Sequence, residues 1–274
     1  MIDLHTHSTV SDGTDSPARV AELAAAAGCS AVALTDHDRL DGIAEARARA
    51  AAFGVELVAG CELSCEFSPG TMHVLVYFVE PGDGPLQDEL VRLQAVRDRR
   101  NELMCERLGI PYAELLVEAG GIGAGRPHAA AILVRRGVVG SIQEAFDVYL
   151  AKGRPGYVEK ERLAVGDAVR LARDSGGVAV LAHPFSLGLS PADLGRTVGE
   201  LAELGLAGIE AHYGRYSPED RAGLASLADE HSLVATGGSD HHGDYKPDLA
   251  VGRGTGDLDV PDSALAELRG RLAR

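Results

Sequence analysis

The sequence predicts an α/β fold, because short apolar runs alternate with alanine-rich stretches of helical periodicity along its 274 residues. Alternation of this kind implies parallel strands, which either close into a barrel or form an open sheet. Aromatic residues make up only 4% and tryptophan is absent, so alanine, valine and leucine must fill the core. A chain of this length can form one large domain, or one domain with an insert.

Seven apolar runs are predicted to be strands: Ile2–His5, Ala31–Thr35, Val55–Gly60, Met72–Val79, Val178–Ala182, Ala207–Ala211 and Leu233–Gly237. Six stretches have helical periodicity: Ser16–Ala27, Asp41–Phe53, Ala164–Ser175, Pro191–Leu204, Pro218–Glu230 and Pro261–Leu272. Three of these helices share one start signal, a capping serine followed by proline at the first helical position: Ser16-Pro17, Ser190-Pro191 and Ser217-Pro218.

The alternation is interrupted first between Val55 and Val79, where no helical pattern occurs. Ser68-Pro69-Gly70 separates two strand-like runs there, which predicts an antiparallel hairpin. In a fully parallel barrel, His73 at the start of its strand would lie at the wrong end of the molecule. In a hairpin, the start of that strand lies beside the end of the previous one, next to Glu62.

The second interruption runs from Pro85 to about Val158, where only helix-like segments occur. We interpret residues 85–158 as a helical insert that forms a lid on the ligand-bearing rim of a barrel made of residues 1–84 and 159–274. The alternative is that this stretch simply extends the helical layer of the barrel.

Composition limits the classes of partner. The net charge of −15 means that the surface as a whole should repel nucleic acid, so no stable duplex binding is expected. A nucleic-acid substrate would have to be bound locally, at an end, by metals or a small basic cluster.

The four cysteines, Cys29, Cys61, Cys65 and Cys105, have neither disulfide-framework nor zinc-finger spacing. With no signal peptide and no run of membrane-spanning length, we expect a cytoplasmic protein without membrane contact.

Metal-ligand residue types gather near the ends of the predicted strands, where α/β barrels carry their function. His5-x-His7 ends the first strand, and residues i and i+2 of a strand point to the same side, so both imidazoles can bind one metal. A single histidine after a strand is ordinarily a surface or core residue, but this many on one rim favours a multinuclear metal site. The nine candidate ligands are His5, His7, Asp12, His37, Glu62, His73, His183, Asp240 and His242.

The ligand types indicate the chemistry. Six imidazoles and three carboxylates without a thiolate suit zinc, manganese or iron better than calcium or magnesium. Nine ligands are too many for one or two ions, so we expect three divalent ions. With three carboxylates and one bridging hydroxide, such a centre keeps a net charge of about +2, which complements a phosphomonoester dianion. A metal-bridging hydroxide would then attack phosphorus, and Asp240 would both ligate a metal and accept the proton as the catalytic base.

The chain resembles the PHP (polymerase and histidinol phosphatase) family through motifs in the same order: His5-Thr-His7, Ser11-Asp12-Gly13, Thr35-Asp36-His37-Asp38, Gly60-Cys61-Glu62, His73, Ala182-His183-Pro184 and Gly238-Ser239-Asp240-x-His242. The resemblance covers the whole chain. It implies a distorted seven-stranded β/α (TIM-like) barrel, a trinuclear site and phosphoesterase activity. It also implies a division of ligands among the ions: His5, His7, Glu62 and Asp240 for the first, Glu62, His73 and His183 for the second, and Asp12, His37 and His242 for the third.

Part of the insert resembles one subgroup of that family: Gly125-Arg126-Pro127-His128, Ala145-Phe146 and Gly153-Arg154-Pro155-Gly156-Tyr157-Val158. Those relatives carry a helical lid and hydrolyse nucleotide phosphates, such as nucleoside 3′,5′-bisphosphates, or trim short oligonucleotides from the 5′ end. Basic residues among glycines in so acidic a chain indicate a second phosphate site, for which Arg126, His128 and Lys152 are the candidates. Lys152 and Arg154 can equally be solvated helix ends.

Two other functions are compatible with these motifs. One is histidinol-phosphate phosphatase, which shares the metal site. The other is a non-catalytic metal-binding module, like the degenerate PHP domains attached to some polymerases. A degenerate domain should have lost ligands, whereas this chain retains all nine. A metal-dependent phosphoric ester hydrolase acting on nucleotides is therefore the favoured function.

Overall fold

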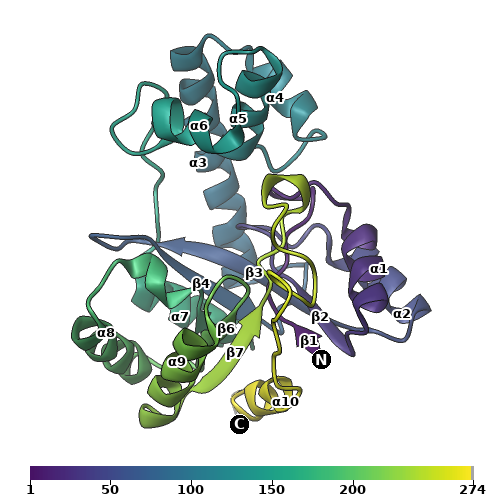
Figure 1. Ribbon diagram of the computed structural model, residues 1–274, viewed down its shortest axis with the longest axis vertical. Coiled ribbons are helices and arrows are strands. Elements are labelled where there is room, and N and C mark those ends of the chain that lie inside the picture. Colours follow the sequence, from purple (N-terminus) through teal and green to yellow (C-terminus); the bar gives the residue numbers. More distant parts are fainter. Residues whose placement is uncertain (273–274) are drawn as a thin grey trace.

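The structure, a computed structural model, describes residues 1–272 and contains a seven-stranded sheet whose strands lie in chain order. The strands are β1 (Ile2–Asp3), β2 (Ala31–Leu34), β3 (Glu56–Cys65), β4 (Met72–Tyr77), β5 (Val178–Leu181), β6 (Gly208–Tyr213) and β7 (Val234–Gly238). Just beyond β1, the Leu4 amide donates a 3.0 Å hydrogen bond to the Gly237 carbonyl in β7. The first and last strands thus meet, and the sheet forms the predicted barrel-shaped α/β fold (Figure 1).

Six helices accompany the strands: α1 (Pro17–Ala27), α2 (Ile43–Ala52), α7 (Val165–Asp174), α8 (Pro191–Glu203), α9 (Pro218–Glu230) and α10 (Ser263–Gly270). They match the six predicted helices to within a few residues at each end. Ser16, Ser190 and Ser217 each accept a backbone hydrogen bond from the third helical residue, so the three predicted start signals are confirmed.

The predicted hairpin is also confirmed, since β4 pairs antiparallel with β3 and places His73 opposite Ser64. β4 is antiparallel to β5 as well, so it is the one reversed strand of the described sheet. β3 continues to Cys65, beyond the predicted end at Gly60, because its residues 60–65 pair with β4. Glu62 therefore lies within a two-stranded ribbon and not, as predicted, at the end of a strand.

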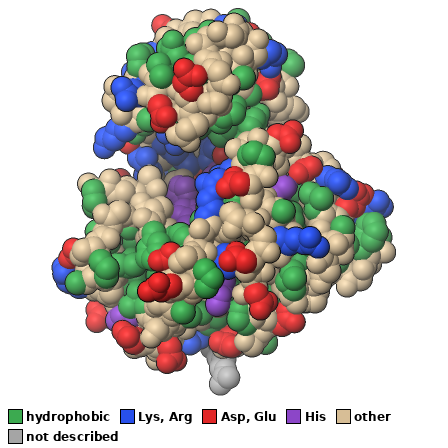
Figure 2. Space-filling model, viewed as in Figure 1, with side chains coloured by type: hydrophobic (Ala, Val, Ile, Leu, Met, Phe, Trp, Pro, Cys, Tyr) green, Lys and Arg blue, Asp and Glu red, His purple; other side chains and the backbone are tan. Residues whose placement is uncertain are grey.

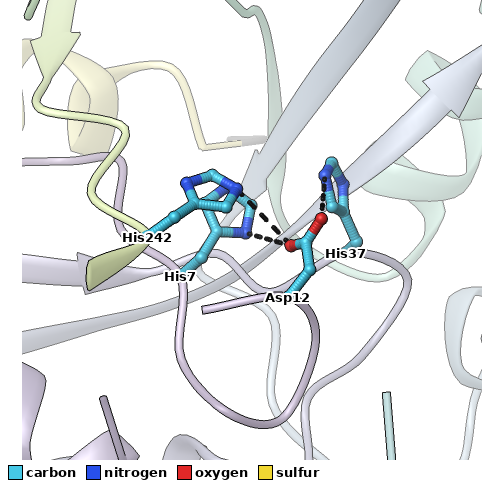
Figure 3. Close-up of side chains that lie close together, drawn as sticks. All are labelled: His7, Asp12, His37 and His242. Atoms are coloured by element: carbon cyan, nitrogen blue, oxygen red, sulfur yellow. Dashed lines mark ion pairs between the residues drawn. The ribbon is translucent and has the colours of Figure 1, made fainter. Parts of the chain in front are cut away.

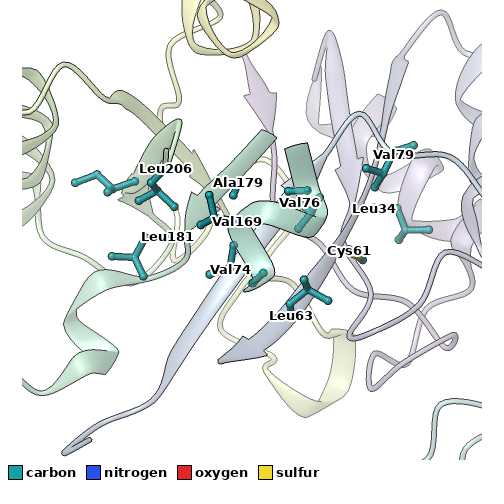
Figure 4. Close-up of a cluster of buried hydrophobic side chains, with 14 of the residues drawn as sticks. Leu34, Cys61, Leu63, Val74, Val76, Val79, Val169, Ala179, Leu181 and Leu206 are labelled. Carbon is teal, nitrogen blue, oxygen red and sulfur yellow. The ribbon is translucent and has the colours of Figure 1, made fainter. Parts of the chain in front are cut away.

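Alternation along the strands separates two apolar cores. Val74 and Val76 belong to the cluster between the sheet and the helices, together with Leu34, Leu63 and other residues drawn in Figure 4. Leu75 and Tyr77 point the other way, into a second cluster that includes Leu4 and the apolar face of α10. Inside it the Tyr77 hydroxyl donates to the Leu4 carbonyl at 2.7 Å.

Four α-helices and a π-helix form a separate body between β4 and β5, here called the helical body: α3 (Pro85–Leu108), α4 (Tyr112–Glu118), α5 (Arg126–Arg135), α6 (Ile142–Ala145) and η1 (Phe146–Leu150). It has its own apolar cluster, which includes Met104, Leu115 and Ile132. Figure 1 shows the long α3 rising from the barrel to carry α4, α5 and α6 above it.

Two contacts bring the chain between β4 and β5 to the rim of the barrel. Gly123, with φ +70°, lies so close to the loop after β1 that a Cβ there would be 2.1 Å from the Val10 carbonyl oxygen. Only glycine fits at this point, which brings the start of α5 towards that loop. Farther along, Leu163 pairs with the end of β3, donating to the Ser64 carbonyl at 3.1 Å. The segment that leads from the helical body back to β5 therefore passes over the rim of the barrel.

Within residues 1–272, no helix combines the length and the apolar character needed to cross a membrane.

Candidate metal centre

All nine candidate ligands lie together at one end of the barrel. They fall into four overlapping groups, in each of which the ligand atoms lie within 4.8 Å of one another: His7, Asp12, His37 and His242; His5, His7 and Asp240; His5, Glu62 and His183; His37, Glu62 and His73. Two of the ligands, His183 (φ 29°) and Asp240 (φ 55°), have positive backbone dihedrals. Such strain in residues other than glycine is typical of functional sites.

Glu62 is the central carboxylate. Its Oε1 lies 2.8 Å from His73 Nδ1 and 3.1 Å from His183 Nε2. Its Oε2 lies 3.1 Å from both His7 Nε2 and His37 Nδ1. Burial alone would raise the pKa of Glu62, but the surrounding histidines hold it well below its usual range. Glu62 is thus an anion whose two oxygens face different histidines, as a carboxylate that bridges two metal ions would.

Asp12 is the second carboxylate, and its side chain faces His7, His37 and His242 (Figure 3). Its oxygens lie 3.4 Å from His242 Nε2 and 3.8 Å from His7 Nδ1 and His37 Nε2. Most of these distances are too long for hydrogen bonds, and buried Asp12 Oδ1 finds no hydrogen-bond partner among the described residues. A buried carboxylate oxygen without a partner is costly, so the approach of His7, His37 and His242 to Asp12 fits a cation between them.

Burial holds two of the histidines, His37 and His242, in the neutral form that metal binding requires. Burial lowers the pKa of His37 well below its usual value, and burial together with Lys246 lowers that of His242 to about 4. Burial would also lower the pKa of His5, but the carboxylates of Glu210, Asp240 and Glu62 outweigh it and raise that pKa. The surroundings of His5 therefore favour positive charge, which a metal ion would supply.

A carboxylate outside the ligand set orients His5. Glu210 Oε1 lies 2.9 Å from His5 Nδ1, which leaves Nε2 to face the centre. His5 Nε2 lies 3.1 Å from His7 Nε2. Two ligands bound at about 2.1 Å to a shared ion are separated by about 3.0–3.4 Å, so this pair fits one metal. The Glu210 side chain also accepts the His183 amide at 2.8 Å through Oε2, and so holds two ligand-bearing loops.

Asp240 uses its two oxygens differently. Oδ1 faces the centre, 3.5 Å from the Nε2 atoms of His5 and His7. Oδ2 accepts the Tyr213 hydroxyl at 2.7 Å and the Lys246 ammonium at 2.5 Å. Burial would raise the pKa of Asp240, but Lys246 and the histidines hold it well below its usual range. These contacts fit a metal-ligating anion, and its further role as a proton acceptor stays a prediction.

A cavity of about 580 Å³ opens above the ligands, between the helical body and the barrel. Asp12, His37, His73 and His242 form part of its floor. Seven cationic side chains also line it: Arg97, Arg100, Arg126, Lys160, Arg162, Arg215 and Lys246. Figure 2 shows basic side chains and histidine gathered in this hollow. In a chain with net charge −15, such a local reversal of sign indicates an anionic ligand.

The three predicted substrate residues occupy different surroundings. Arg126 begins α5 and lines the cavity, with its guanidinium 5.6 Å from the centre of the Phe146 ring. His128 is buried, and its Nδ1 accepts the Gly125 amide at 3.1 Å, so this atom caps α5. Lys152 is exposed and does not belong to the cavity lining; Lys160 extends into the cavity instead.

Sequence reasoning missed several residues of this site. Glu210 and Tyr213 had a signal, because a glutamate within the apolar run of β6 and a tyrosine at its end follow the strand-end rule that pointed to the candidate ligands. Lys246 and Lys160 lie in loops where no periodicity predicts a direction. Arg100 lies on α3 among other charged residues, and only its packing distinguishes it from its exposed neighbour Arg99.

Known proteins resemble this chain over nearly its full length. Residues 3–157 match the family model of the PHP domain. The 3′,5′-nucleoside bisphosphate phosphatase of Chromobacterium violaceum is 34% identical over 256 residues, covering 88% of this chain and 87% of that protein. The 5′-3′ exoribonuclease Rnm of Escherichia coli is 33% identical, covering 88% and 84%. Among solved structures, a candidate metal-dependent phosphoesterase from Bifidobacterium adolescentis superimposes with a TM-score of 0.89 at 28% identity, covering 100% and 96%.

The family-model match and these near full-length relatives show that the chain belongs to the PHP domain family.

Proposed function

We propose that this chain is a metal-dependent phosphoesterase that hydrolyses nucleoside 3′,5′-bisphosphates, phosphate esters at the 5′ ends of short oligonucleotides, or both. The observation that carries the proposal is the juxtaposition of nine metal-ligand side chains with a cavity lined by seven cations. A small phosphorylated substrate has the charge that such a cavity attracts. The relatives named as a nucleoside bisphosphate phosphatase and a 5′-3′ exoribonuclease support this choice of substrate class.

The nine ligands would hold three divalent ions of manganese, iron or zinc. In support, the group of His7, Asp12, His37 and His242 contains the three ligands proposed for the third ion, and the group of His5, His7 and Asp240 contains three of the four proposed for the first. Glu62 contacts both His73 and His183, which together would hold the second ion. When bound, such ions supply Lewis-acid activation of the phosphate ester and of a water molecule.

The remaining residues would position and enclose the substrate. Tyr213 and Lys246 fix the orientation of Asp240 through its Oδ2. Residues 85–158 would act as the lid over a barrel of residues 1–84 and 159–274, since the helical body forms the far wall of the cavity. Arg126 reaches the cavity from the first turn of α5 and would contact a phosphate other than the reacting one.

A substrate panel tests the function. Manganese-loaded protein should hydrolyse adenosine 3′,5′-bisphosphate or 5′-phosphorylated short RNA with kcat/KM at least about 100-fold above that for histidinol phosphate. Released phosphate and labelled nucleotide products provide the measurement. A preference for histidinol phosphate would establish the alternative phosphatase, and no hydrolysis of any of the three would favour a metal-binding module.

Metal content provides a second test. Elemental analysis of the purified protein should give close to three transition-metal ions per chain, and His37→Ala should remove one ion before the other two. The reason is that His37 faces Asp12, whose other neighbours at this site are His7 and His242. His231→Ala is the matched control, because this histidine ends α9 outside the ligand groups. One ion per chain in fully active protein would contradict the assignment.

A further inference from the structure

Phe185 is an exposed aromatic side chain beside the metal centre. Of the five phenylalanines, only Phe53 and Phe185 are exposed in the part of the chain that the structure describes, at 51% and 44%. The Phe53 ring, at the end of α2, is covered by the Arg49 guanidinium, 4.9 Å from the ring centre. Phe185 instead follows the candidate ligand His183 by two residues, so their Cα atoms lie within about 7 Å of each other.

The segment that carries Phe185, the 3-10 helix η2 (Pro184–Leu187), is held by hydrogen bonds to two other parts of the barrel. The Phe185 amide donates to the Tyr216 hydroxyl at 2.9 Å. The Thr71 amide donates to the Ser186 carbonyl, and the Ser186 hydroxyl donates to the Thr71 carbonyl, each at 2.9 Å. The exposed ring is therefore presented by a fixed backbone.

Phe185 is the outermost member of a row of aromatic rings. Its ring centre lies 4.7 Å from that of Tyr216, which lies 4.8 Å from that of Tyr213. Tyr213 lies 5.6 Å from the His183 ring and donates its hydroxyl to Asp240 at 2.7 Å. A single exposed apolar residue is ordinary, whereas packed rings that lead from a metal centre to the surface form a ready stacking surface.

The rings of Phe185 and Tyr216, here called the aromatic platform, adjoin the cavity without lining it. Thr71, which is bonded to Ser186, and Arg215, the chain neighbour of Tyr216, both belong to the cavity lining. Both come from the barrel, whereas the cavity wall opposite is the helical body. A nucleotide that reaches from the helical body to the metal ligands would fill the cavity. The nucleotide after it would emerge along the barrel rim, where the aromatic platform lies.

We propose that the aromatic platform is a nucleobase subsite, which stacks the base of the nucleotide that follows the scissile phosphate. This inference rests on the proposed function and selects within it. A 5′-phosphorylated oligonucleotide gains a contact that a nucleoside 3′,5′-bisphosphate lacks, because the bisphosphate has no second base. Every base has a flat π face, so stacking on Phe185 is independent of base identity. The platform therefore favours short oligonucleotides of any sequence.

Two substrates that differ only in the second nucleoside provide the kinetic test. Adenosine 3′,5′-bisphosphate and the 5′-phosphorylated dinucleotide of adenosine share the first nucleotide and the phosphate that follows it. With manganese-loaded protein, Phe185→Ala should lower the kcat/KM of the dinucleotide relative to the bisphosphate by about tenfold, the effect of one lost base–aromatic stack. Phe53→Ala removes the other exposed phenylalanine and should leave this ratio unchanged.

Two conservative variants show whether the ring itself matters. Phe185→Tyr keeps an aromatic face and should retain the wild-type ratio. Phe185→Leu keeps an apolar side chain of similar reach without a π face, so it should lose most of the preference for the dinucleotide. Since Phe185 is exposed, neither change should disturb the core.

Calorimetric titration provides a readout that does not depend on turnover. The ligand is the same dinucleotide with a phosphorothioate linkage, which slows hydrolysis, and adenosine 5′-monophosphate is the reference without a second base. Phe185→Ala should weaken binding of the dinucleotide by about tenfold and leave binding of the monophosphate unchanged. A purely structural role of Phe185 would change both affinities together.

The outcomes separate this inference from the proposed function. Weaker dinucleotide binding in Phe185→Ala and Phe185→Leu, with unchanged monophosphate binding, would support the subsite even if no substrate were hydrolysed. Hydrolysis with an unchanged substrate ratio and unchanged affinities would overturn the subsite and leave the phosphoesterase proposal intact. Equal losses on the bisphosphate and the dinucleotide would show that Phe185 acts through His183 or the fold, which would also overturn it.

Discussion

Replacing Glu62 with glutamine is expected to reduce kcat/KM for every phosphate ester by roughly three orders of magnitude and to lower the metal content. Glu62 is buried, and its two oxygens contact His7, His37, His73 and His183 at 2.8–3.1 Å. Breaking such a buried charged contact costs about 3–5 kcal/mol, and about 1.4 kcal/mol corresponds to a factor of ten. Glutamine has nearly the same shape, so the loss would reflect charge rather than packing.

Glu66→Gln is the matched control for this experiment. Glu66 follows the end of the same strand but is exposed and belongs to none of the ligand groups. It should retain full activity and metal content. Wild-type activity in Glu62→Gln would show that hydrolysis does not need the carboxylate at the centre of the histidines, and it would remove the basis for the proposed arrangement of ions.

The sequence predicts most of the barrel because the signals there are local. Serine followed by proline begins α1, α8 and α9, and Ser68-Pro69-Gly70 turns the hairpin. The predicted end of β3 at Gly60 was wrong for a non-local reason, since the extension to Cys65 depends on pairing with β4. Strand periodicity describes one strand at a time, whereas the length of a strand in a hairpin depends on its partner.

The candidate site likewise contains residues that local sequence signals predict and residues whose position depends on tertiary packing. The convergence of the nine candidate ligands was predictable because barrel strands direct their ends to one rim, and all nine lie together there. The basic residues of the cavity depend on how the helical body docks, which no local pattern encodes. Lys152 and Lys160 look alike in the sequence, but only Lys160 lines the cavity, where it contacts Asp38 and Ser64. Arg100 and Arg99 are adjacent on α3, and packing alone buries one of them.

Arg126→Ala is expected to weaken turnover of a nucleoside 3′,5′-bisphosphate by about one to three orders of magnitude, the scale of a lost charge-assisted contact. Turnover of a small aryl phosphate should barely change, and the metal content should stay intact. The physical reason is that the metal centre can neutralise only the phosphoryl group being cleaved, so a second phosphate needs a cation of its own. Arg126 lines the cavity without a carboxylate partner in the described residues, which leaves its charge available.

Two further variants make this prediction specific. Arg154→Ala removes an exposed arginine of the same helical region and should leave both substrates unaffected. Phe146→Leu removes the ring over which the Arg126 guanidinium lies, 5.6 Å from its centre, and should give a smaller loss confined to the bisphosphate. Equal losses on the bisphosphate and the aryl phosphate in Arg126→Ala would mean that Arg126 serves the reaction centre or the fold. Selection of the substrate would then have to lie in the barrel loops, because the first turn of α5 would contribute nothing to it.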